Sequence, residues 1–331
     1  MKTPKQITAT EWGGAYLESI KKVAERQSEV SIQWLVVAGA INALPLLHAN
    51  RPHGGIDLVA GYEASFQEIA REGFAEPVTA EKVPNLRDVP QRLLIRDEAG
   101  NVVNIPRTLT ALFWFYRRDI TPFEIRTLDD FLDPRLKGKI CFPALTINSC
   151  LQLVSIALYK GGNEKNMEPA WAFMKRLARS GNIGRVGRSI NEIHRSLQSG
   201  ETSITFEAGN CAVELARDHE MRLLMKRGDP AATGFWAFLL HQGWSVIKGG
   251  QTDAAFAFVN FAIGPEINAE FNALAAGLPA NRHAQVAPEA EPLRFSDEDI
   301  ERYAYVPDWA FVTRQTEAWI QRWNEEIEPL L

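Results

Sequence analysis

Strand and helix patterns alternate over the first 73 residues, and this alternation constrains the fold more than any other feature of the sequence. A short strand at the start of 7–16 leads through Gly13-Gly14 into an amphipathic helix. Further strands at 30–37 and 56–60 are each followed by a helical stretch. Such alternation predicts a parallel sheet with helices on its faces. Ligands of these sheets bind beyond the carboxyl ends of the strands.

A second series of strands and helices begins at Thr127, after an extended region that includes the aromatic strand 112–116. A capping pattern at Thr127 precedes a strand at 139–143, and another at Ser189 opens a helix. The strand 202–206 then ends at an acidic residue. Two α/β series joined by extended segments predict two lobes with a ligand cleft between them.

The expected division of the chain follows from these two series. We expect residues 1–108 and 231–292 to form the first lobe and residues 109–230 to form the second. The C-terminal helices of 293–331 are expected to pack on the second lobe. Hinge crossovers are expected near Pro106–Ala111 and Gly228–Gly234, with a third connecting strand or loop before the C-terminal helices.

Composition and charge exclude several classes of partner. The net charge is −5 and the pI about 5.8, so there is no basic stripe of the kind that nucleic acid requires. No apolar run approaches the roughly 20 residues that a membrane-spanning helix needs. Residues 1–6 lack the hydrophobic core of a signal peptide. The three cysteines and six histidines show no metal-ligand spacing, so we expect neither a metal site nor a cofactor.

Six segments, in order along nearly the whole chain, resemble those of one protein family. They are 7–16 with its Trp-Gly-Gly turn, 55–59, 127–143 (TLDDFLDPRLKGKICFP), 200–204, 244–249 with 255–261, and 277–282. Together they resemble the bacterial extracellular solute-binding proteins of ABC importers, in the spermidine/putrescine-binding-like branch. No single motif carries the resemblance, which depends on the order and spacing of all six.

The resemblance implies a two-lobed type II periplasmic-binding fold whose lobes close on a solute about hinge crossovers. It also implies a small-molecule ligand, inner-membrane ABC permease subunits as partners, and a monomer. The location would be the periplasm, with a signal peptide removed, so that Met1 would be a cloned start. In this interpretation the protein is a receptor and not an enzyme.

Aromatic residues near predicted strand ends are candidates for the walls of the ligand site. Trp12 and Tyr62 follow strands of the first series, and Trp236 lies where the resemblance places a cleft aromatic. Aromatic faces attract cationic ligands. The amide of Gly13 is expected to donate a hydrogen bond to the ligand, because the glycine pair lets the backbone approach closely.

The polar candidates lie in the second series. Asn148 and Ser149, beside a helix N-terminus, suit an anion, and Arg185 suits a carboxylate or phosphate. Glu207 suits an ammonium group, although a glutamate at a helix start also simply complements the helix dipole. Arg185 fits a solvated loop arginine equally well. The polyamine binders carry acids at the start of the helix near Asn148, and this chain does not. An amino-carboxylate or other zwitterion therefore fits better than a diamine, and a polyamine-like solute remains an alternative.

Two other classes of function are alternatives to a receptor. Thiamine-degrading and pyrimidine-synthesising enzymes share the implied fold, and one kind uses a cysteine nucleophile. Cys150, near a helix N-terminus, would then have a lowered pKa. The second alternative is the effector domain of a regulator, but the sequence contains no helix-turn-helix or basic DNA-binding segment.

Overall fold

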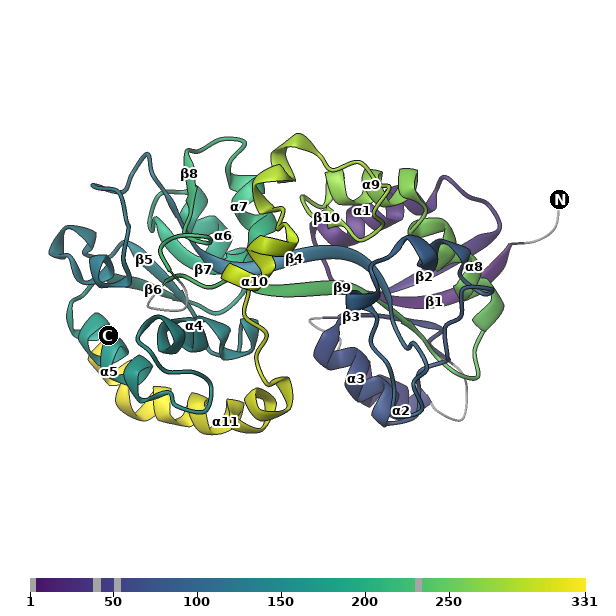
Figure 1. Ribbon diagram of the computed structural model, residues 1–331, viewed down its shortest axis with the longest axis horizontal. Coiled ribbons are helices and arrows are strands. Elements are labelled where there is room, and N and C mark those ends of the chain that lie inside the picture. Colours follow the sequence, from purple (N-terminus) through teal and green to yellow (C-terminus); the bar gives the residue numbers. More distant parts are fainter. Residues whose placement is uncertain (1–3, 38–42, 51–54, 230–233) are drawn as a thin grey trace. The chain divides into compact units, whose positions relative to one another are not determined.

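The computed structural model describes residues 4–37, 43–50, 55–229 and 234–331 (Figure 1). The chain divides into two compact units, each built from two stretches of sequence. Unit 1 contains residues 1–110 and 240–293, and unit 2 contains residues 111–239 and 294–331. Each unit has strands covered by helices, so the α/β class predicted from the sequence is confirmed.

The alternation predicted for the start of the chain is present in unit 1. Its first six elements are β1 (Lys5–Glu11), α1 (Ala15–Ala24), β2 (Val30–Val36), α2 (Ala43–Asn50), β3 (Leu58–Tyr62) and α3 (Glu63–Arg71). β1 pairs in parallel with both β2 and β3, with Ala9 opposite Leu58. The strand β9 (Phe238–Val246) pairs antiparallel with β3. The carboxyl ends of β1 and β3 therefore lie at the same edge of the sheet.

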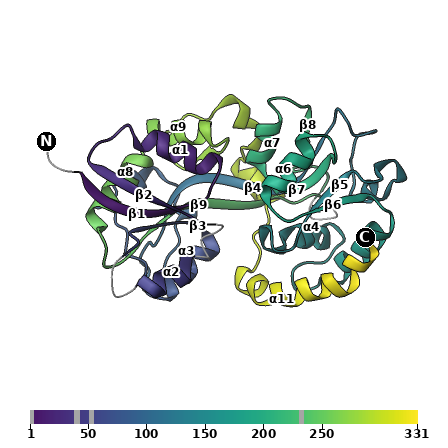
Figure 2. The same cartoon turned by 180° about the vertical axis from the view of Figure 1, so that it is seen from behind.

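Helices cover both faces of the sheet of unit 1. One apolar cluster joins β1 and β3 to α1, α8 (Thr252–Ala262) and α9 (Pro265–Leu274), through side chains that include Ile20, Phe258 and Phe271. On the opposite face Val59 packs with Phe66 of α3. Figure 2 shows α1 and α9 on one side of these strands and α2 and α3 on the other. A sheet covered on both faces leaves its strand ends as the places where a polar ligand can bind.

Unit 2 is built on the strand order β4-β7-β5-β6. These strands are β4 (Ile105–Arg117), β5 (Ile140–Pro143), β6 (Ile183–Gly187) and β7 (Ile204–Ala208), and β8 (Met221–Leu223) pairs with β4. β5 is parallel to β6 and β7, whereas β7 is antiparallel to β4. The carboxyl ends of β5, β6 and β7 therefore share one edge.

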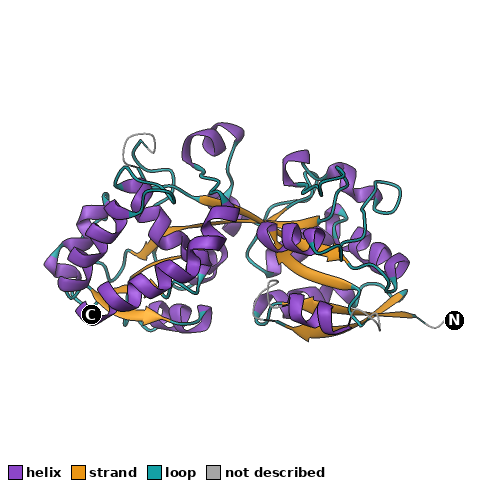
Figure 3. Cartoon of the chain, turned by 90° about the horizontal axis from the view of Figure 1, so that it is seen from below, coloured by secondary structure: helices purple, strands orange, loops and turns teal. Residues whose placement is uncertain are grey.

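The helices of unit 2 include two that come from the end of the chain. The helices of this unit are α4 (Leu151–Tyr159), α5 (Glu168–Arg179), α6 (Ile190–Gln198), α7 (Gly209–Leu215), α10 (Asp297–Tyr303) and α11 (Trp309–Glu326). The two from the end of the chain are α10 and α11. In the view from below, helices (purple) lie over the strands (orange) of each unit (Figure 3).

The chain passes between the units at three places. The first lies inside β4, between Thr110 and Ala111, and the second inside β9, between Leu239 and Leu240. The third follows Leu293. Of the expected crossover at 228–234, residues 230–233 lie outside the described part of the chain.

The two predicted helix caps form with different geometries. Thr127 accepts a hydrogen bond from the amide of Asp130, whose carboxylate accepts from the amide of Thr127, and this complete capping box opens a 3-10 helix. At α6, Ser189 accepts from the amide of Glu192. The Glu192 carboxylate reaches one residue further back and accepts from the amide of Arg188 at 2.9 Å. The cap is therefore shifted relative to the reciprocal pair that the sequence predicted.

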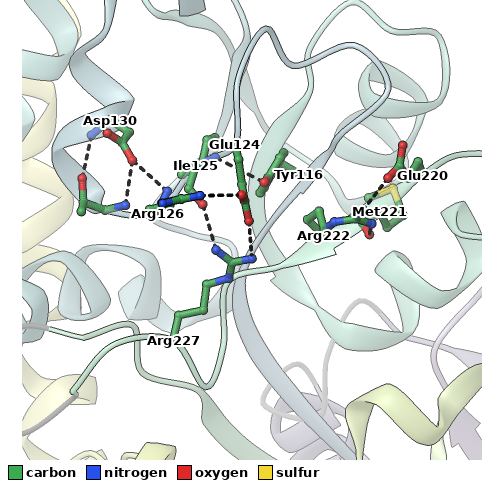
Figure 4. A network of polar contacts seen from close by, with 10 residues as sticks. Tyr116, Glu124, Ile125, Arg126, Asp130, Glu220, Met221, Arg222 and Arg227 are labelled. Atoms are coloured by element: carbon green, nitrogen blue, oxygen red, sulfur yellow. Dashed lines mark hydrogen bonds and ion pairs between the residues drawn. The ribbon is translucent and has the colours of Figure 1, made fainter.

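A polar network fixes the loop that follows β4 in unit 2 (Figure 4). The carboxylate of Glu124 lies 3.1 Å from Arg227 and 3.2 Å from Arg126, and these arginines lower its pKa. Arg227 also donates to the carbonyl of Ile125. The buried hydroxyl of Tyr116 accepts a hydrogen bond from the backbone amide of Ile125. The charges of this loop are thus paired with one another and hold it to residue 227.

Two findings concern the described part of the chain as a whole. None of its helices combines the length and the apolar character needed to cross a membrane. Within the same residues, no cluster of three or more His, Cys, Asp or Glu side chains is arranged to bind a metal ion.

The buried His241 of β9 predicts a loss of stability in mild acid. Its side chain is buried, Nε2 has no hydrogen-bond partner among the described residues, and burial lowers its pKa from 6.5 to about 4. Between these pH values the imidazole binds a proton in the unfolded chain but not in the folded chain. The unfolding free energy therefore falls by about 3 kcal/mol as the pH drops from about 6.5 to 4. Denaturant titrations across this range should show that slope in the wild type and lose it in His241→Gln. The surface variant His283→Gln should retain it.

Candidate functional site

One group of candidate residues lies at the turn that follows β1 in unit 1. β1 ends at Glu11 and α1 begins at Ala15, as the sequence predicted. Gly14 has φ of +70°, a conformation that glycine adopts without steric cost. Gly13 is exposed and the side chain of Trp12 is half-buried. The turn therefore presents an accessible amide and an indole at the end of the strand.

A buried ion pair lies beneath this turn. Arg107 of β4 donates from Nη1 and Nη2 to the two carboxylate oxygens of Glu11, at 2.5 and 2.7 Å. Both side chains are completely buried. The guanidinium lies 4.3 Å from the ring centroid of Trp244 and 4.8 Å from that of Phe271. It also faces Trp12 at 5.7 Å, so the pair connects the indole to the sheet.

Trp12 and Tyr62 occupy corresponding places at the same sheet edge of unit 1. The amide of Trp12 donates to Glu11 at 3.0 Å, and its ring meets Tyr16 edge to face, with centroids 5.7 Å apart. Tyr62 ends β3, precedes α3 and is half-buried. Since β1 and β3 are parallel neighbours, the structure brings these two predicted aromatic residues to one edge.

A second group of candidate residues, within unit 2, joins Glu207 to Asn148. Glu207 lies at the end of β7 and its side chain is 2% exposed. Its carboxylate accepts hydrogen bonds from the amide of Ala208 at 2.8 Å and from Asn148 Nδ2 at 3.1 Å. Burial raises the pKa of Glu207, and these two donors only partly oppose the shift. Among the described residues, no arginine, lysine or histidine forms an ion pair with it.

Asn148 begins a turn with a left-handed backbone. Asn148, Ser149 and Cys150 have φ of 58°, 50° and 63°, and none of them is glycine. Left-handed residues other than glycine normally occur singly, and each costs about 1–2 kcal/mol. The short 3-10 turn 148–150 leads directly into α4. Three strained residues in succession beside a buried carboxylate are the kind of outlier that marks a functional segment.

Arg185, for which the sequence left a ligand contact and a solvated loop position equally open, is paired with two glutamates. It lies on β6 and its side chain is 35% exposed. Nη1 donates to Glu192 at 2.6 Å, while Nε and Nη2 donate to Glu201 at 3.1 and 2.7 Å. Both edges of the guanidinium are therefore already occupied by carboxylates. The structure does not bring Arg185 into contact with Asn148 or Glu207 among the interactions of the described residues.

Trp236 lies in unit 2, immediately before β9. Its half-buried ring packs on Tyr305 with centroids 5.8 Å apart and an interplanar angle of 70°. The neighbouring Ala237 exchanges backbone hydrogen bonds with Tyr303 and Tyr305. The C-terminal segment thus packs against Trp236, which the sequence predicted as a wall residue.

Sequence reasoning missed Arg107 and Tyr305. An arginine near the start of the largely buried strand β4 was a signal that could have revealed a buried ion pair, because such a charge needs a partner. No local signal connects Tyr305 to Trp236, which it contacts only through the tertiary fold.

The expectation of a lowered pKa at Cys150 is wrong. The thiol is completely buried, and burial raises its pKa to about 12, while contact with Thr316 opposes the shift. Position beside a helix start does not activate a cysteine that has been removed from water. Cys141 is also buried, with its pKa raised to about 12, which confirms it as a core residue. These thiols are protonated at neutral pH and are poor nucleophiles.

Comparisons with known proteins agree with this architecture. A sequence model of the family described as bacterial extracellular solute-binding protein matches residues 19–296. Among solved structures, the chain is similar to an ABC transporter from Clostridium perfringens ATCC 13124, with 19% identity, coverage of 97% of this chain and 100% of that chain, and a TM-score of 0.71. A comparison with curated proteins finds no match.

Two further solved structures share the fold. The spermidine/putrescine ABC transporter substrate-binding protein PotD from Streptococcus pneumoniae has 14% identity and a TM-score of 0.72, over 96% of this chain and 99% of that chain. Maltose-bound MalE3 of T. maritima has 15% identity and a TM-score of 0.76, over 98% and 100%. At these identities the likeness establishes the fold alone, and it confirms the expected type II periplasmic-binding fold.

Removing one partner of the buried ion pair should destabilise the protein strongly. Glu11→Gln leaves the buried Arg107 guanidinium without its carboxylate, so we expect the unfolding free energy to fall by about 3–5 kcal/mol, measured by denaturant titration. The exposed pair of Arg26 and Glu266 is the matched control, and Glu266→Gln should change little. Equal effects of the two substitutions would contradict a structural role for the buried pair.

The left-handed turn predicts a stabilising glycine substitution. Ser149→Gly removes the Cβ that opposes φ of 50°, so we expect the unfolding free energy to rise by about 1 kcal/mol. Ser149→Ala, which also loses the hydroxyl but keeps the Cβ, should bring no such gain. Thermal unfolding of both variants checks the expectation, and equal melting temperatures would show that the turn is not strained.

Proposed function

The chain belongs to the bacterial extracellular solute-binding proteins, which are receptors of ABC transporters, and from that premise we propose that its solute carries an ammonium group that pairs with Glu207. Membership confirms the resemblance carried by the sequence motifs. It places the protein in the periplasm, where such receptors bind a small molecule and deliver it to membrane permease subunits. The nature of the solute is the proposal argued below.

The observation that carries the proposal is the contrast between two glutamates at strand ends. Glu11 follows β1 and Glu207 ends β7, and each carboxylate accepts a hydrogen bond from the amide of the next residue. Glu11 is neutralised by Arg107, whereas Glu207 has no cation among the described residues. A buried carboxylate without a counter-ion is costly, so a cation supplied by the solute would complete the site.

Neighbouring groups support an amine more than an isolated anion. Asn148 donates to Glu207 from its Nδ2, which leaves its carbonyl oxygen, and the hydroxyl of Ser149 is half-buried beside it. An ammonium group has three donors and can use a carboxylate, an amide oxygen and a hydroxyl together. We assign no ligand contact to Arg185, because both of its edges are paired with glutamates.

In this proposal the aromatic candidates of each unit offer apolar surface to the solute. Trp12 and Tyr62 provide aromatic surface at the sheet edge, the Gly13 amide provides a donor, and Trp236 in unit 2 provides a further aromatic face. The receptor acts as a monomer and captures the solute by hinge closure, which shifts the population toward a closed form. The Streptococcus pneumoniae neighbour is described as a spermidine/putrescine receptor, which is compatible with an amine.

Substituting Glu207 should raise the stability of the protein and, in the same variant, weaken its binding of the solute. The raised pKa means that Glu207 stabilises the fold fully only below its unfolded pKa, and that this contribution is lost as pH rises through the folded value. Without ligand, Glu207→Gln should therefore melt at a higher temperature at pH 7. Its affinity for the amine should fall by about 100-fold, because one charge-assisted pair is lost.

A thermal-shift screen of putrescine, spermidine, amino-carboxylates and amine-free carboxylates identifies the ligand, and calorimetric titration of the best one compares the variants. Glu214→Gln is the matched control: it removes another acid of unit 2 whose pKa is raised by burial, and it should leave the affinity unchanged. Binding of a carboxylate without an amine, or undiminished binding to Glu207→Gln, would overturn the proposal. Small-angle scattering with and without the bound amine tests hinge closure, which identical profiles would exclude.

A further inference from the structure

One buried carboxylate holds the segment that leads into the C-terminal helix α11. Glu164 lies in the loop between α4 and α5 and is 5% exposed. One of its oxygens accepts a hydrogen bond from the hydroxyl of Tyr305 at 2.5 Å, and the other accepts from the backbone amide of Asp308 at 2.9 Å. Both oxygens of Glu164 are therefore used, and both donors come from the residues just before α11.

The loop that carries Glu164 is closed by its own hydrogen bonds. The side-chain carbonyl of Asn163 accepts from the amides of Lys165 and Asn166, at 2.9 and 3.0 Å. Asn163 and Asn166 also exchange backbone hydrogen bonds, so Glu164 stands at the tip of a tight turn. Lys165 pairs with Asp308 at 3.1 Å. The turn thus presents Glu164 to the C-terminal segment in a defined place.

The ring of Tyr305 contacts two aromatic side chains at the start of β9. Its centroid is 5.8 Å from that of Trp236 and 6.0 Å from that of Phe238, and it meets both rings edge to face. The backbone amide of Tyr305 donates to the carbonyl of the residue between them at 2.8 Å. Phe238 in turn meets Phe206, the residue before Glu207, with centroids 6.0 Å apart. Tyr305 is therefore packed both on the candidate wall residue and on a neighbour of the strand that carries Glu207.

We propose that Glu164 and Tyr305 are positioning residues for Trp236, and that the hydrogen bond between them sets the angle at which the indole meets the solute. A half-buried indole with a fixed backbone still has several side-chain rotamers open to it. The edge-to-face contact with Tyr305 favours one of them, and the bond from the hydroxyl to a carboxylate fixes the Tyr305 ring. Neither Glu164 nor Tyr305 touches the solute in this proposal.

The part played by the indole in binding rests on the proposed function, whereas its orientation by Tyr305 does not. The orientation is therefore tested without any solute. Tyr305→Phe removes the hydroxyl, keeps the ring, and leaves the bond from Asp308 to Glu164 in place. Tyr303→Phe is the matched control, because Tyr303 accepts from the amide of Ala237 through its backbone carbonyl, which the substitution keeps.

The full chain is labelled with fluorotryptophan, and the fluorine resonance of Trp236 is assigned by its loss in Trp236→Phe. We expect this resonance to shift and broaden in Tyr305→Phe and in Glu164→Ala, since each variant removes the same hydrogen bond. The resonance of Trp34 in unit 1, and all resonances in Tyr303→Phe, should match the wild type. A Trp236 resonance that stays in place in Tyr305→Phe, even if Glu164→Ala moves it, would overturn the proposal.

Binding is then measured in a double-substitution cycle with Trp236→Leu. The titration uses whichever of putrescine, spermidine and the amino-carboxylates stabilises the wild type most. We expect Tyr305→Phe to weaken binding about fivefold in the wild-type background and to leave it unchanged in Trp236→Leu. Equal weakening in both backgrounds would overturn the proposal, because Tyr305 would then act by another route.

The two proposals fail separately. If none of these compounds binds, or if Glu207→Gln binds as the wild type does, the proposed function fails, while the fluorine resonance still decides the role of Tyr305. A displaced resonance together with undiminished binding to Trp236→Leu would support the hold of Tyr305 on the indole and overturn the place of Trp236 at the amine site.

Discussion

The buried pair of Arg107 and Glu11 is the interaction on which the sheet edge of unit 1 that carries the candidate Trp12 depends. The two side chains have no solvent access, and each satisfies the other with two hydrogen bonds in a fork geometry. The carbonyl of Arg107 is held as well, by the side-chain amides of Asn268 and Asn272 at 2.8 and 3.0 Å. The strand β4 is therefore locked to α9 at the residue that also fixes Trp12. Because β4 continues into unit 2, this lock lies on a segment shared by both units.

The same local arrangement has opposite electrostatic consequences in the two units. At the ends of β1 and β7 a glutamate folds back on the amide that follows it. In unit 1 an arginine of the protein neutralises that glutamate, and the result is a rigid support. In unit 2 the described residues supply only amide donors to Glu207, which burial leaves with a raised pKa. A site of this kind trades stability for binding, since the unpaired acid is unfavourable until a cationic ligand arrives.

Strain and support are distributed over distant parts of the sequence in unit 2. The turn 148–150 is left-handed at three residues that are not glycine, which no local preference favours. Asn148 at its start is bonded to Glu207 of β7, and the thiol of Cys150 at its end donates to the carbonyl of Leu145. The wall residue Trp236 is likewise supported by Tyr305, from the C-terminal segment. A residue that follows the family-matched segment thus supports a candidate wall residue of unit 2.

The sequence by itself determined the features that depend on neighbours along the chain. Strand and helix periodicity, the Gly13-Gly14 turn and the caps at Thr127 and Ser189 are visible within a few residues, and the structure contains them all. The order of segments also identified the family and hence the fold. Even here tertiary packing adjusted the details, because Glu192 caps one residue earlier than the pattern predicted.

Only the tertiary structure decided which charges meet. Glu11 and Arg107 are 96 residues apart, and Asn148 and Glu207 are 59 apart, so no spacing rule connects them. Arg185 has the residue type of an anion ligand, but the fold places two glutamates around it. The environment of a charged side chain depends on burial and on partners brought from distant segments. Local sequence therefore predicts where a polar group stands on its strand or helix, and the fold decides whether that group is already paired within the protein.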